Sequence, residues 1–389
     1  ILTMYKEFLN RGIHPRVLQR GSIGEGDIST LSLIGQTMIG SGEVEYKGEI
    51  VSSTQAMSAE GIPPACLGPK DGLSIVSSNA QGEALAAVLV YETEQLLEEA
   101  DAVFCLSLEG LNGGLQPLGE KVNALRQLSG QQRSAARCRD FLAGSYLEQP
   151  DPQRALQDPL SFRCASAVHG SVWDALDFVK QHLELQLNAT DDNPCIFVDE
   201  GTTSVSQNFE TTTLALGVEM LAAALNHMSK CICYRLIHLA DPAFTGLSRF
   251  LTPAEVKTIA YGTIQKVYTV LDAENRMLAN PSSMDFIAVA GSIEDHASNL
   301  PLAAAKTRKI VDNLRYMLGI EAMHAAQAVD LRGRPALGRV TGPVHNALRR
   351  EVPYLSADRN LSIDIEKAYR FILEGRLFQA IQGAAEQAR

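Results

Sequence analysis

Three long segments with few internal prolines and many Ala, Leu and Met residues constrain the fold of this chain more than any other feature. They cover residues 210–240, 253–278 and 302–331, and the apolar residues of a fourth segment, from 72 to about 106, also keep a helical period. Helices of this length pack their apolar stripes against one another or against copies in an oligomer. The sequence therefore predicts a mainly α fold built on a bundle of very long helices.

Shorter patterns predict the remaining elements. Alternating residues around Lys47-Gly48 indicate a small β-hairpin over 43–51, and a second short strand pair is expected around 195–198 and 203–206. Further helices are expected over 1–12, 31–39, 120–141, 162–187 and 363–375, with a loop over 144–159. From Gly333 the chain is more polar and interrupted by prolines, so we expect a helical core over 1–332 and a C-terminal helical segment over 333–389.

The composition narrows the class of partner. Of the 389 residues 46% are hydrophobic and 20% are charged, and the formal net charge is −11. A chain of this length and composition can bury a large core. The charge, without any basic run, argues against nucleic acid or an anionic membrane surface as a partner. A small molecule or a protein partner is left.

Cysteine and histidine usage indicates an intracellular protein without a metal. The seven cysteines form no Cys-x-x-Cys motif, and Cys231 and Cys233 are the single close pair. This is typical of reduced thiols rather than of a disulfide framework or a zinc site. The eight histidines lack the spacing of metal ligands, so we expect no metal and no cofactor. Without a signal-like N-terminus or an apolar run of eighteen residues, we expect a cytoplasmic protein with no membrane partner.

A glycine-rich stretch over residues 20–31, Arg-Gly-Ser-Ile-Gly-Glu-Gly-Asp-Ile-Ser-Thr-Leu, is the first candidate for a functional site. Its glycines allow a tight turn and a close approach of backbone to a ligand, and Asp27-Ile28-Ser29-Thr30 predicts a helix start with a capping residue. Free N–H groups at such a helix start can bind an anion such as a substrate carboxylate. An ordinary turn between two helices is the alternative for this stretch taken alone.

This stretch resembles the signature of the aromatic amino-acid ammonia-lyases, the family of histidine and phenylalanine ammonia-lyase. That family reads Arg-Gly-Ser-Val-Gly-Ala-Ser-Gly-Asp-Leu, and its Ala-Ser-Gly cyclises into the electrophile methylidene-imidazolone (MIO). Glu25-Gly26 stands in place of Ala-Ser-Gly here and is one residue shorter. Further matches to the family follow in the family's order: Gln157-Asp158-Pro159-Leu160-Ser161-Phe162-Arg163-Cys164, Asp192-Asn193-Pro194, Asn208-Phe209 and Glu294-Asp295-His296.

The resemblance implies a fold and an assembly. The family has a central bundle of long helices of the ammonia-lyase/fumarase type and forms a homotetramer whose active sites are shared between subunits, so the same is expected here. The family also carries an N-terminal lobe of about a hundred residues, with a catalytic tyrosine, that has no counterpart before Ile1. We therefore expect that the chain is a fragment or that another chain supplies this lobe.

Four residues match family positions that contact the substrate. Arg163 matches an arginine that pairs with the substrate carboxylate, which suits the two parallel donors of a guanidinium. Asn193 matches an amide that also holds the carboxylate, Gln157 a hydrogen-bonding residue, and Phe209 an aromatic wall of the pocket. The structural alternatives are a helix-capping or Asp158-paired arginine, a turn asparagine before proline, and an ordinary core phenylalanine.

Glu294 and Glu25 are the predicted catalytic carboxylates. Glu294 matches a glutamate that lies near the substrate imidazole in the histidine-specific members, and its alternative is a solvated or ion-paired residue. Glu25 stands where the electrophile should be and would attract a fixed positive charge, unless it is only a solvent-facing loop residue. Leu160 replaces a tyrosine near MIO, and Ser77-Ser78 replace an Asn-Gly pair, so the MIO and its neighbours are lost together. We expect His296 to be structural.

The chemistry that remains without MIO points to a quaternary amine. MIO forms an adduct with a nitrogen lone pair, which a trimethylammonium group lacks and does not need, because it leaves as neutral trimethylamine. The pattern resembles the MIO-free ergothionase branch of the family. It predicts elimination of trimethylamine from a histidine betaine, from ergothioneine to thiourocanate first and from hercynine to urocanate second. A thione-bearing imidazole would acidify the Cβ–H for a tyrosine base from the absent lobe.

Two other functions compete with this prediction. One is an ordinary histidine or aromatic amino-acid ammonia-lyase, which the lack of any Ala-Ser-Gly in the chain disfavours. The other is a non-catalytic binding protein on the same scaffold. A mere scaffold need not keep Arg163, Asn193, Gln157 and Glu294.

Overall fold

The structure, a computed structural model, describes residues 1–284 and 286–386. The chain divides into two compact units. The first comprises Ile1–Val88, Val179–Glu219 and Pro281–Ala305, and the second comprises Leu89–Phe178, Met220–Asn280 and Lys306–Arg389. The expected division into 1–332 and 333–389 stays a prediction.

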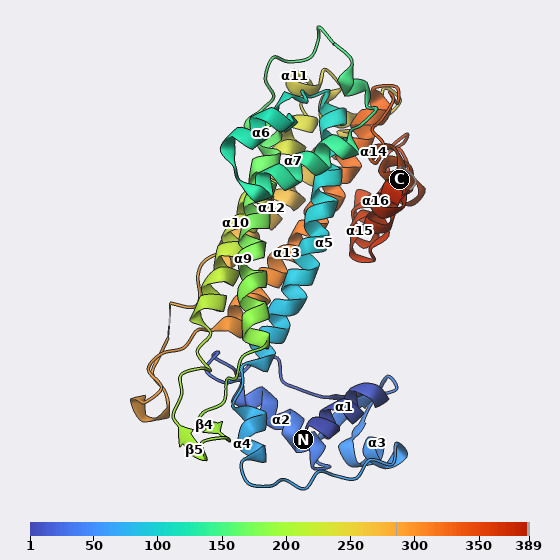
Figure 1. The fold of residues 1–389 in the computed structure, drawn as a ribbon. Coiled ribbons are helices and arrows are strands. Elements are labelled where there is room, and N and C mark those ends of the chain that lie inside the picture. Colours follow the sequence, from blue (N-terminus) through green and yellow to red (C-terminus); the bar gives the residue numbers. More distant parts are fainter. Residues whose placement is uncertain (285, 387–389) are drawn as a thin grey trace. The chain divides into compact units, whose positions relative to one another are not determined.

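The second unit is a bundle of long helices (Figure 1). It holds the larger part of four helices, α5 (Ala80–Leu111), α9 (Ala165–Leu187), α10 (Thr212–Leu239) and α13 (Leu300–Leu331), and all of α12 (Gln265–Leu278). Their facing sides bury apolar side chains, among them Leu96, Phe104, Trp173, Leu225, Ile232 and Leu314. The prediction of a mainly α fold with a bundle of long helices is confirmed.

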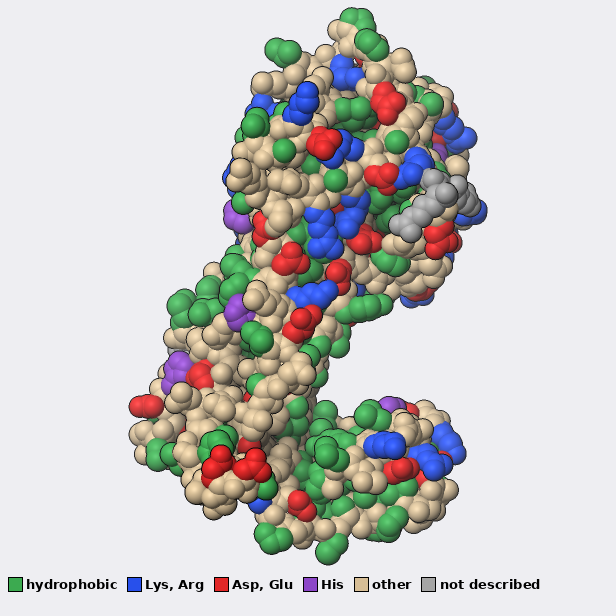
Figure 2. Space-filling view, in the orientation of Figure 1, with side chains coloured by type: hydrophobic (Ala, Val, Ile, Leu, Met, Phe, Trp, Pro, Cys, Tyr) green, Lys and Arg blue, Asp and Glu red, His purple; other side chains and the backbone are tan. Residues whose placement is uncertain are grey.

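Shorter helices complete the second unit. They are α6 (Glu120–Arg126), α7 (Ser129–Phe141), α8 (Leu160–Arg163), α11 (Pro242–Thr245), α14 (Thr341–Glu351), α15 (Leu361–Leu373) and α16 (Arg376–Glu386). The sequence predicted α15 but missed α14 and α16. On the face that Figure 2 shows, acidic and basic side chains are interspersed over this unit.

The first unit contains a small sheet packed on short helices. Strands β1 (Ile13–Pro15), β2 (Glu43–Tyr46) and β3 (Glu49–Ser52) pair antiparallel in this order, and α1 (Leu2–Arg11), α2 (Ile28–Met38), α3 (Ser53–Ala59) and α4 (Asp71–Val76) surround them. The predicted hairpin is confirmed, with positive φ at both turn residues, Lys47 and Gly48. Strands β4 (Cys195–Phe197) and β5 (Thr202–Ser204) form the second predicted pair.

Three predicted helices are interrupted. The helix expected over 72–106 breaks at 77–79, between α4 and α5, where backbone and side chains bond to the glycine-rich stretch instead. The helix expected over 253–278 begins only at Gln265, after a short 3₁₀ segment, since Ala260 has a positive φ. The helix expected over 120–141 is split at Gln127, which adopts the left-handed conformation.

Among the described residues one stretch, Asp71–Leu111, which comprises α4 and α5, is long and apolar enough by length and composition to cross a membrane. One such helix is weak evidence for a span, because core helices of large bundles meet the same criterion. Helix α5 has buried carboxyl groups inside the bundle: Asp101 accepts a hydrogen bond from Ser134 and Glu109 one from Ser145. These contacts are typical of a core helix.

Glu99, also on α5, gives the fold a testable pH dependence. Its side chain is 1% exposed, and burial raises its pKa from 4.5 to about 8 although Arg315 lies nearby. An acid whose pKa is higher in the folded than in the unfolded protein costs stability as pH rises from the unfolded toward the folded value. We expect the melting temperature to fall between pH 5 and pH 8 in part for this reason.

Replacing Glu99 by Gln should raise the free energy of unfolding at pH 8 by on the order of 2 kcal/mol and flatten its pH dependence. Thermal unfolding at pH 5 and pH 8 measures both effects. The neighbouring Glu98→Gln is the control, because Glu98 pairs with Arg137 near the surface and its loss should cost less than about 1 kcal/mol. Equal pH profiles for wild type and Glu99→Gln would contradict the assignment.

Candidate active site

The glycine-rich stretch folds as a tight loop that leads into α2. Gly21, Gly24 and Gly26 all have positive φ, and a side chain on Gly24 would collide with Ser298 Oγ. The helix start predicted at Asp27 is confirmed, but Asp27 does not cap α2 with its side chain. Its buried carboxylate instead accepts hydrogen bonds from Gly82 N (2.9 Å) and from Ser22 Oγ. The loop is therefore fixed to the start of α5 rather than to its own helix.

Asn79 holds the loop from the other side, and no sequence pattern pointed to this residue. Its side chain is fully buried; Oδ1 accepts from Gly26 N at 2.9 Å and Nδ2 donates to the carbonyl oxygen of Phe209 at 2.5 Å. Its backbone N–H donates to Asp191 Oδ2 at 3.0 Å. One residue in the break between α4 and α5, through its side chain and its backbone, thus contacts three segments distant in sequence.

A cavity of about 540 Å³ opens beside this loop, entirely within the first unit. Its walls come from segments that precede the N-termini of α2, α5, α10 and α13. Five of the eight predicted site residues line it: Glu25, Ser77, Asn193, Phe209 and Glu294. The roles predicted for them stay predictions, but the fold brings their side chains to one place.

Asn193 is held in place at this cavity by two hydrogen bonds. Its Oδ1 accepts from Ser206 N at 3.0 Å, and its backbone N–H donates to Ser77 Oγ at 3.3 Å. The bond to Ser206 fixes which side of the amide faces the loop. Among the described residues the Nδ2 group has no hydrogen-bond acceptor, which is the arrangement an amide needs to donate to a ligand.

The other three predicted residues, Gln157, Leu160 and Arg163, belong to the second unit. Arg163 Nη1 donates to Gln157 Oε1 at 2.6 Å, and Leu160 is 60% exposed. Of the described residues that line the cavity, none is one of these three. The hydrogen bond of the Arg163 side chain goes to Gln157 rather than to Asp158, although its charge helps to lower the pKa of Asp158 against the effect of burial.

Three further titratable residues line the cavity: Glu210, Asp295 and His296. Asp295 and His296 lie within a matched motif, and Glu210 directly follows Asn208-Phe209. Its place directly after Asn208-Phe209 was the one sequence signal that could have identified Glu210. With Glu25 and Glu294, four carboxyl groups face the cavity, and no Lys or Arg is among the described residues that line it. Such a site attracts a cation.

Glu25 and Glu210 form the most perturbed pair of titratable groups in this cavity. Their backbones make an isolated antiparallel bridge. Glu210 accepts hydrogen bonds from Thr212 N (2.6 Å) and Thr212 Oγ1 (2.5 Å), and His296 Nε2 lies 2.9 Å from its Oε2. Burial first, and then the hydrogen bond to Glu210, raises the pKa of Glu25 to about 8.

The pKa of Glu210 moves in the opposite direction. Burial alone would raise it, but the hydrogen bonds from Thr212 and Glu25 and the neighbouring His296 together lower it. Two carboxyl groups in contact titrate as a pair, and one proton is shared between them at neutral pH. The proton resides on Glu25 because Glu210 has the stronger donors.

Glu25, Glu210 and His296 could surround a metal ion by distance alone, because one ligand atom of each lies within 4.8 Å of the others. A carboxyl group that keeps its proton is a poor ligand, since ligands bind metals in their deprotonated form. Glu210 also uses its oxygens for Thr212 and His296. We therefore interpret the cluster as an acid pair that shares a proton.

This interpretation predicts the effect of chelation. Dialysis against EDTA should leave the activity and the melting temperature unchanged, because the pair is stabilised by a proton and not by a metal. Metal analysis of the purified protein before and after dialysis provides the check. A loss of activity that returns on adding one divalent cation would contradict it.

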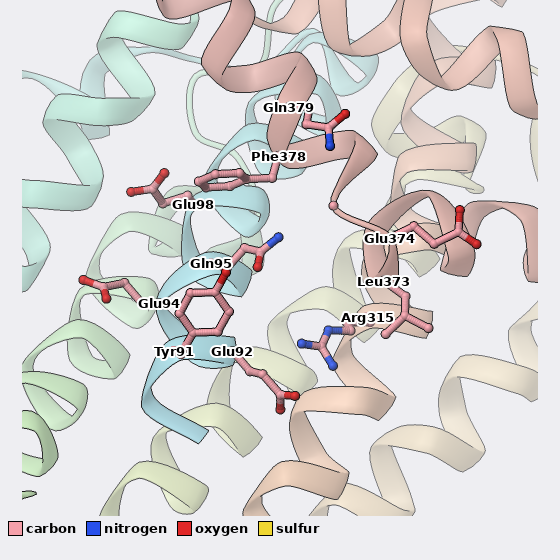
Figure 3. A pocket seen from close by; sticks show the side chains of 11 residues that line it. Tyr91, Glu92, Glu94, Gln95, Glu98, Arg315, Leu373, Glu374, Phe378 and Gln379 are labelled. Carbon is pink, nitrogen blue, oxygen red and sulfur yellow. The ribbon is translucent and has the colours of Figure 1, made fainter. Parts of the chain in front are cut away.

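Another cavity, of about 630 Å³, lies in the second unit between α5, α13 and the segment around Gly375 (Figure 3). Its acidic residues are already paired: Glu92 with Arg308 at 2.8 Å and Glu98 with Arg137 at 3.2 Å. None of the eight predicted site residues is among the described residues that line it. We therefore place the candidate active site in the first unit.

The chain is similar to known proteins over most of its length. A family model described as "Aromatic amino acid lyase" matches residues 1–350. Histidine ammonia-lyase of Geobacillus sp. (strain WCH70) is 35% identical over 367 residues, which are 94% of this chain and 72% of that protein.

Two solved structures are similar over nearly the whole chain. Ergothionase from Treponema denticola, in complex with desmethyl-ergothioneine sulfonic acid, is 59% identical, with a TM-score of 0.95 over 97% of this chain and 76% of that one. Histidine ammonia-lyase from Trypanosoma cruzi is 25% identical, with a TM-score of 0.89 over 98% and 73%. The long-helix bundle, the matched motifs and these similarities together place the chain in the aromatic amino acid lyase family, as a carbon–nitrogen lyase.

Proposed function

We propose that this enzyme eliminates trimethylamine from a histidine betaine without an MIO group, with ergothioneine as the first candidate substrate and hercynine as the second. The observation that carries the proposal is the 59% identity to ergothionase from Treponema denticola, against 35% for the histidine ammonia-lyase of Geobacillus. The substrate analogue in that ergothionase structure supports a small-molecule betaine as the ligand of this site.

The loop sequence supports the same chemistry. Glu25-Gly26 offers no serine to dehydrate where the family has Ala-Ser-Gly. A primary ammonium group needs the electrophile, whereas a quaternary trimethylammonium group leaves as a neutral amine without an adduct. The carboxyl groups that face the cavity, with no Lys or Arg among its described lining residues, suit a ligand with a fixed positive charge.

The predicted residues have distinct roles in this proposal. Glu294 accepts a ring N–H or acts in acid–base catalysis, while Asn193 and Phe209 hold the carboxylate and the ring. Ser77 lies beside Asn193 and supports it. Because Glu25 keeps its proton at neutral pH, the attraction for the cation comes from the Glu25 and Glu210 pair rather than from Glu25 alone.

Arg163, Gln157 and Leu160 enter the proposal through the assembly. In a homotetramer with shared active sites, a second copy of the chain would bring these three residues to the substrate. Arg163 would then use its remaining donors for the carboxylate, with Gln157 Oε1 fixing its orientation at 2.6 Å. The proposed location of the enzyme is the cytoplasm.

Complementation between two inactive variants tests the shared site. Arg163→Ala and Glu294→Gln should each be inactive alone, because each removes a group needed at every site. Co-expression with two different tags, followed by tandem purification, should restore part of the activity if the two residues act from different chains. No recovery in mixed oligomers would contradict the shared site, and Arg163→Lys serves as the control that keeps the charge.

The experiment that tests the function offers the protein ergothioneine, hercynine and histidine in parallel. Trimethylamine, ammonia and the ultraviolet band of a new conjugated acrylate are measured for each. Trimethylamine and acrylate from a betaine, with no product from histidine, are the expected result. Ammonia from histidine would favour an ordinary ammonia-lyase, and no product from any of them would favour the non-catalytic scaffold.

A further inference from the structure

We propose that Glu25 and Glu210 form a one-proton acid pair whose charge follows that of the substrate. The pair loses its proton when a quaternary ammonium group binds and regains one when the amine leaves uncharged. This inference rests on the proposed function and assigns a role to Glu210, which no motif match includes.

The closeness of the two carboxyl groups favours a shared proton. A carboxyl oxygen of Glu25 and one of Glu210 lie within 4.8 Å of each other, and two carboxylates that share a site repel each other unless one of them holds a proton. The Oε1 atom of Glu25 is buried and has no hydrogen-bond partner among the described residues. A buried oxygen without a donor is tolerated far better on a neutral acid than on an anion.

The surroundings of Glu210 determine which member of the pair is charged. Two donors of Thr212 and the ring of His296 hold its carboxylate, at 2.5 to 2.9 Å. Glu25 has the backbone N–H of Ser298 as a donor, a weaker set than that of Glu210. The pair therefore has one negative charge, located on Glu210, in the free enzyme at neutral pH.

The other titratable groups at the cavity are Glu294, Asp295 and His296. Glu294 adds a further negative charge near Glu25 and favours its protonated form. His296 contacts Glu210 rather than Glu25. Among the described residues that line the cavity there is no Lys or Arg that could drive the proton off Glu25 in the absence of substrate.

A bound quaternary ammonium group changes this balance. An opposite charge within about 4–6 Å lowers the pKa of an acid by about 1–3 units. Starting from about 8, such a shift ionises Glu25 near neutral pH. The pair then has two negative charges and faces the cation with both carboxylates.

The reaction reverses the shift. The Cβ proton passes to the base, the C–H electrons form the Cα=Cβ bond, and the Cα–N bond breaks with its electron pair on nitrogen. Trimethylamine is uncharged, so the doubly charged pair loses its counter-ion and takes a proton from solvent. A fixed anion would stabilise the substrate more than the transition state and slow the step. An acid pair that is reprotonated avoids part of this cost.

Proton release on binding is the test, with choline as the quaternary ammonium probe and 3,3-dimethylbutan-1-ol as its uncharged isostere. Calorimetry in two buffers of different ionisation enthalpy should show up to one proton released per site for choline at pH 7 and none for the alcohol. As the pH rises toward 8, the Kd of choline should fall by up to about tenfold per pH unit, because choline binding releases a proton.

Variants assign the proton to the pair. Glu25→Gln and Glu210→Gln should each abolish proton release and remove the pH dependence of Kd. Infrared difference spectra should show a carboxylic acid band that choline removes in the wild type and that is absent in Glu25→Gln. The same substitution at Glu200, in the turn between β4 and β5, should change neither measurement.

The outcomes separate this inference from the proposed function. Trimethylamine release from a betaine without proton release by choline, or without saturable binding of choline, would overturn the acid pair and leave the function standing. Proton release by choline, with no trimethylamine from any betaine, would support the acid pair as a cation site and overturn the function.

Discussion

Replacing Glu294 by Gln is expected to lower kcat/KM for a histidine betaine by about 10²–10⁴-fold, the usual contribution of a group that transfers a proton. Glu294 lines the same cavity as Asn193 and Phe209. Glutamine keeps the size of the side chain, but it can neither accept a proton nor bear a charge. Initial rates of trimethylamine release, measured over a range of substrate concentrations, separate the effect on kcat from that on KM.

Glu200→Gln is the matched control for this measurement. It makes the same chemical change on an exposed turn outside the cavity. The melting temperatures of both variants should stay close to that of the wild type, since Glu294 is exposed. If Glu294→Gln raised KM alone and left kcat unchanged, Glu294 would bind the ring without taking part in proton transfer.

The order of the family motifs made much of the site predictable. Glu25, Asn193, Phe209 and Glu294 are far apart in sequence, and each was identified by its own motif. A sequence motif identifies a residue but does not show which residues lie near it in the fold. The common cavity could therefore be inferred only from the resemblance to the family. The cavity within the first unit now gives these four side chains a shared surrounding.

Contacts that depend on the folded chain could not be predicted. The break at 77–79 lies inside a helical pattern, and local periodicity favoured an uninterrupted helix. Tertiary hydrogen bonds interrupt the helix instead, because the Asn79 side chain bonds to Gly26 and to Phe209. Glu210 was missed for a similar reason: a glutamate after a motif is unremarkable until its contact with Glu25 is known.

The long helices were predictable because their patterns extend over many turns, and the short ones were not. Helix α13 (Leu300–Leu331) matched its prediction over 302–331 within two residues. Helix α14 (Thr341–Glu351) has Pro343 within its first turn, where proline is tolerated. The helix was not predicted because this proline was interpreted only as a helix breaker.

Replacing Arg235 by Met is expected to destabilise the protein by about 3–5 kcal/mol, the cost of leaving one member of a buried ion pair alone. Arg235 and Glu321 are both fully buried in the bundle. Nε and Nη2 of Arg235 donate to the two carboxylate oxygens at 2.6 and 2.9 Å, and Ser107 Oγ donates to Glu321 at 2.9 Å. Methionine would fill part of the volume and leave the carboxylate without its counter-ion. Urea or thermal unfolding measures the loss.

Two further variants separate the missing charge from the missing side-chain volume. Arg235→Met combined with Glu321→Leu should recover much of the loss, because an apolar pair of similar size removes the unpaired charge. Arg308→Met on the same helix as Glu321 breaks a partly exposed pair with Glu92 and should cost less than about 1 kcal/mol. A loss for Arg235→Met no larger than that for Arg308→Met would mean that the buried pair contributes little, and that packing around Phe104 and Trp173 holds the bundle together without it.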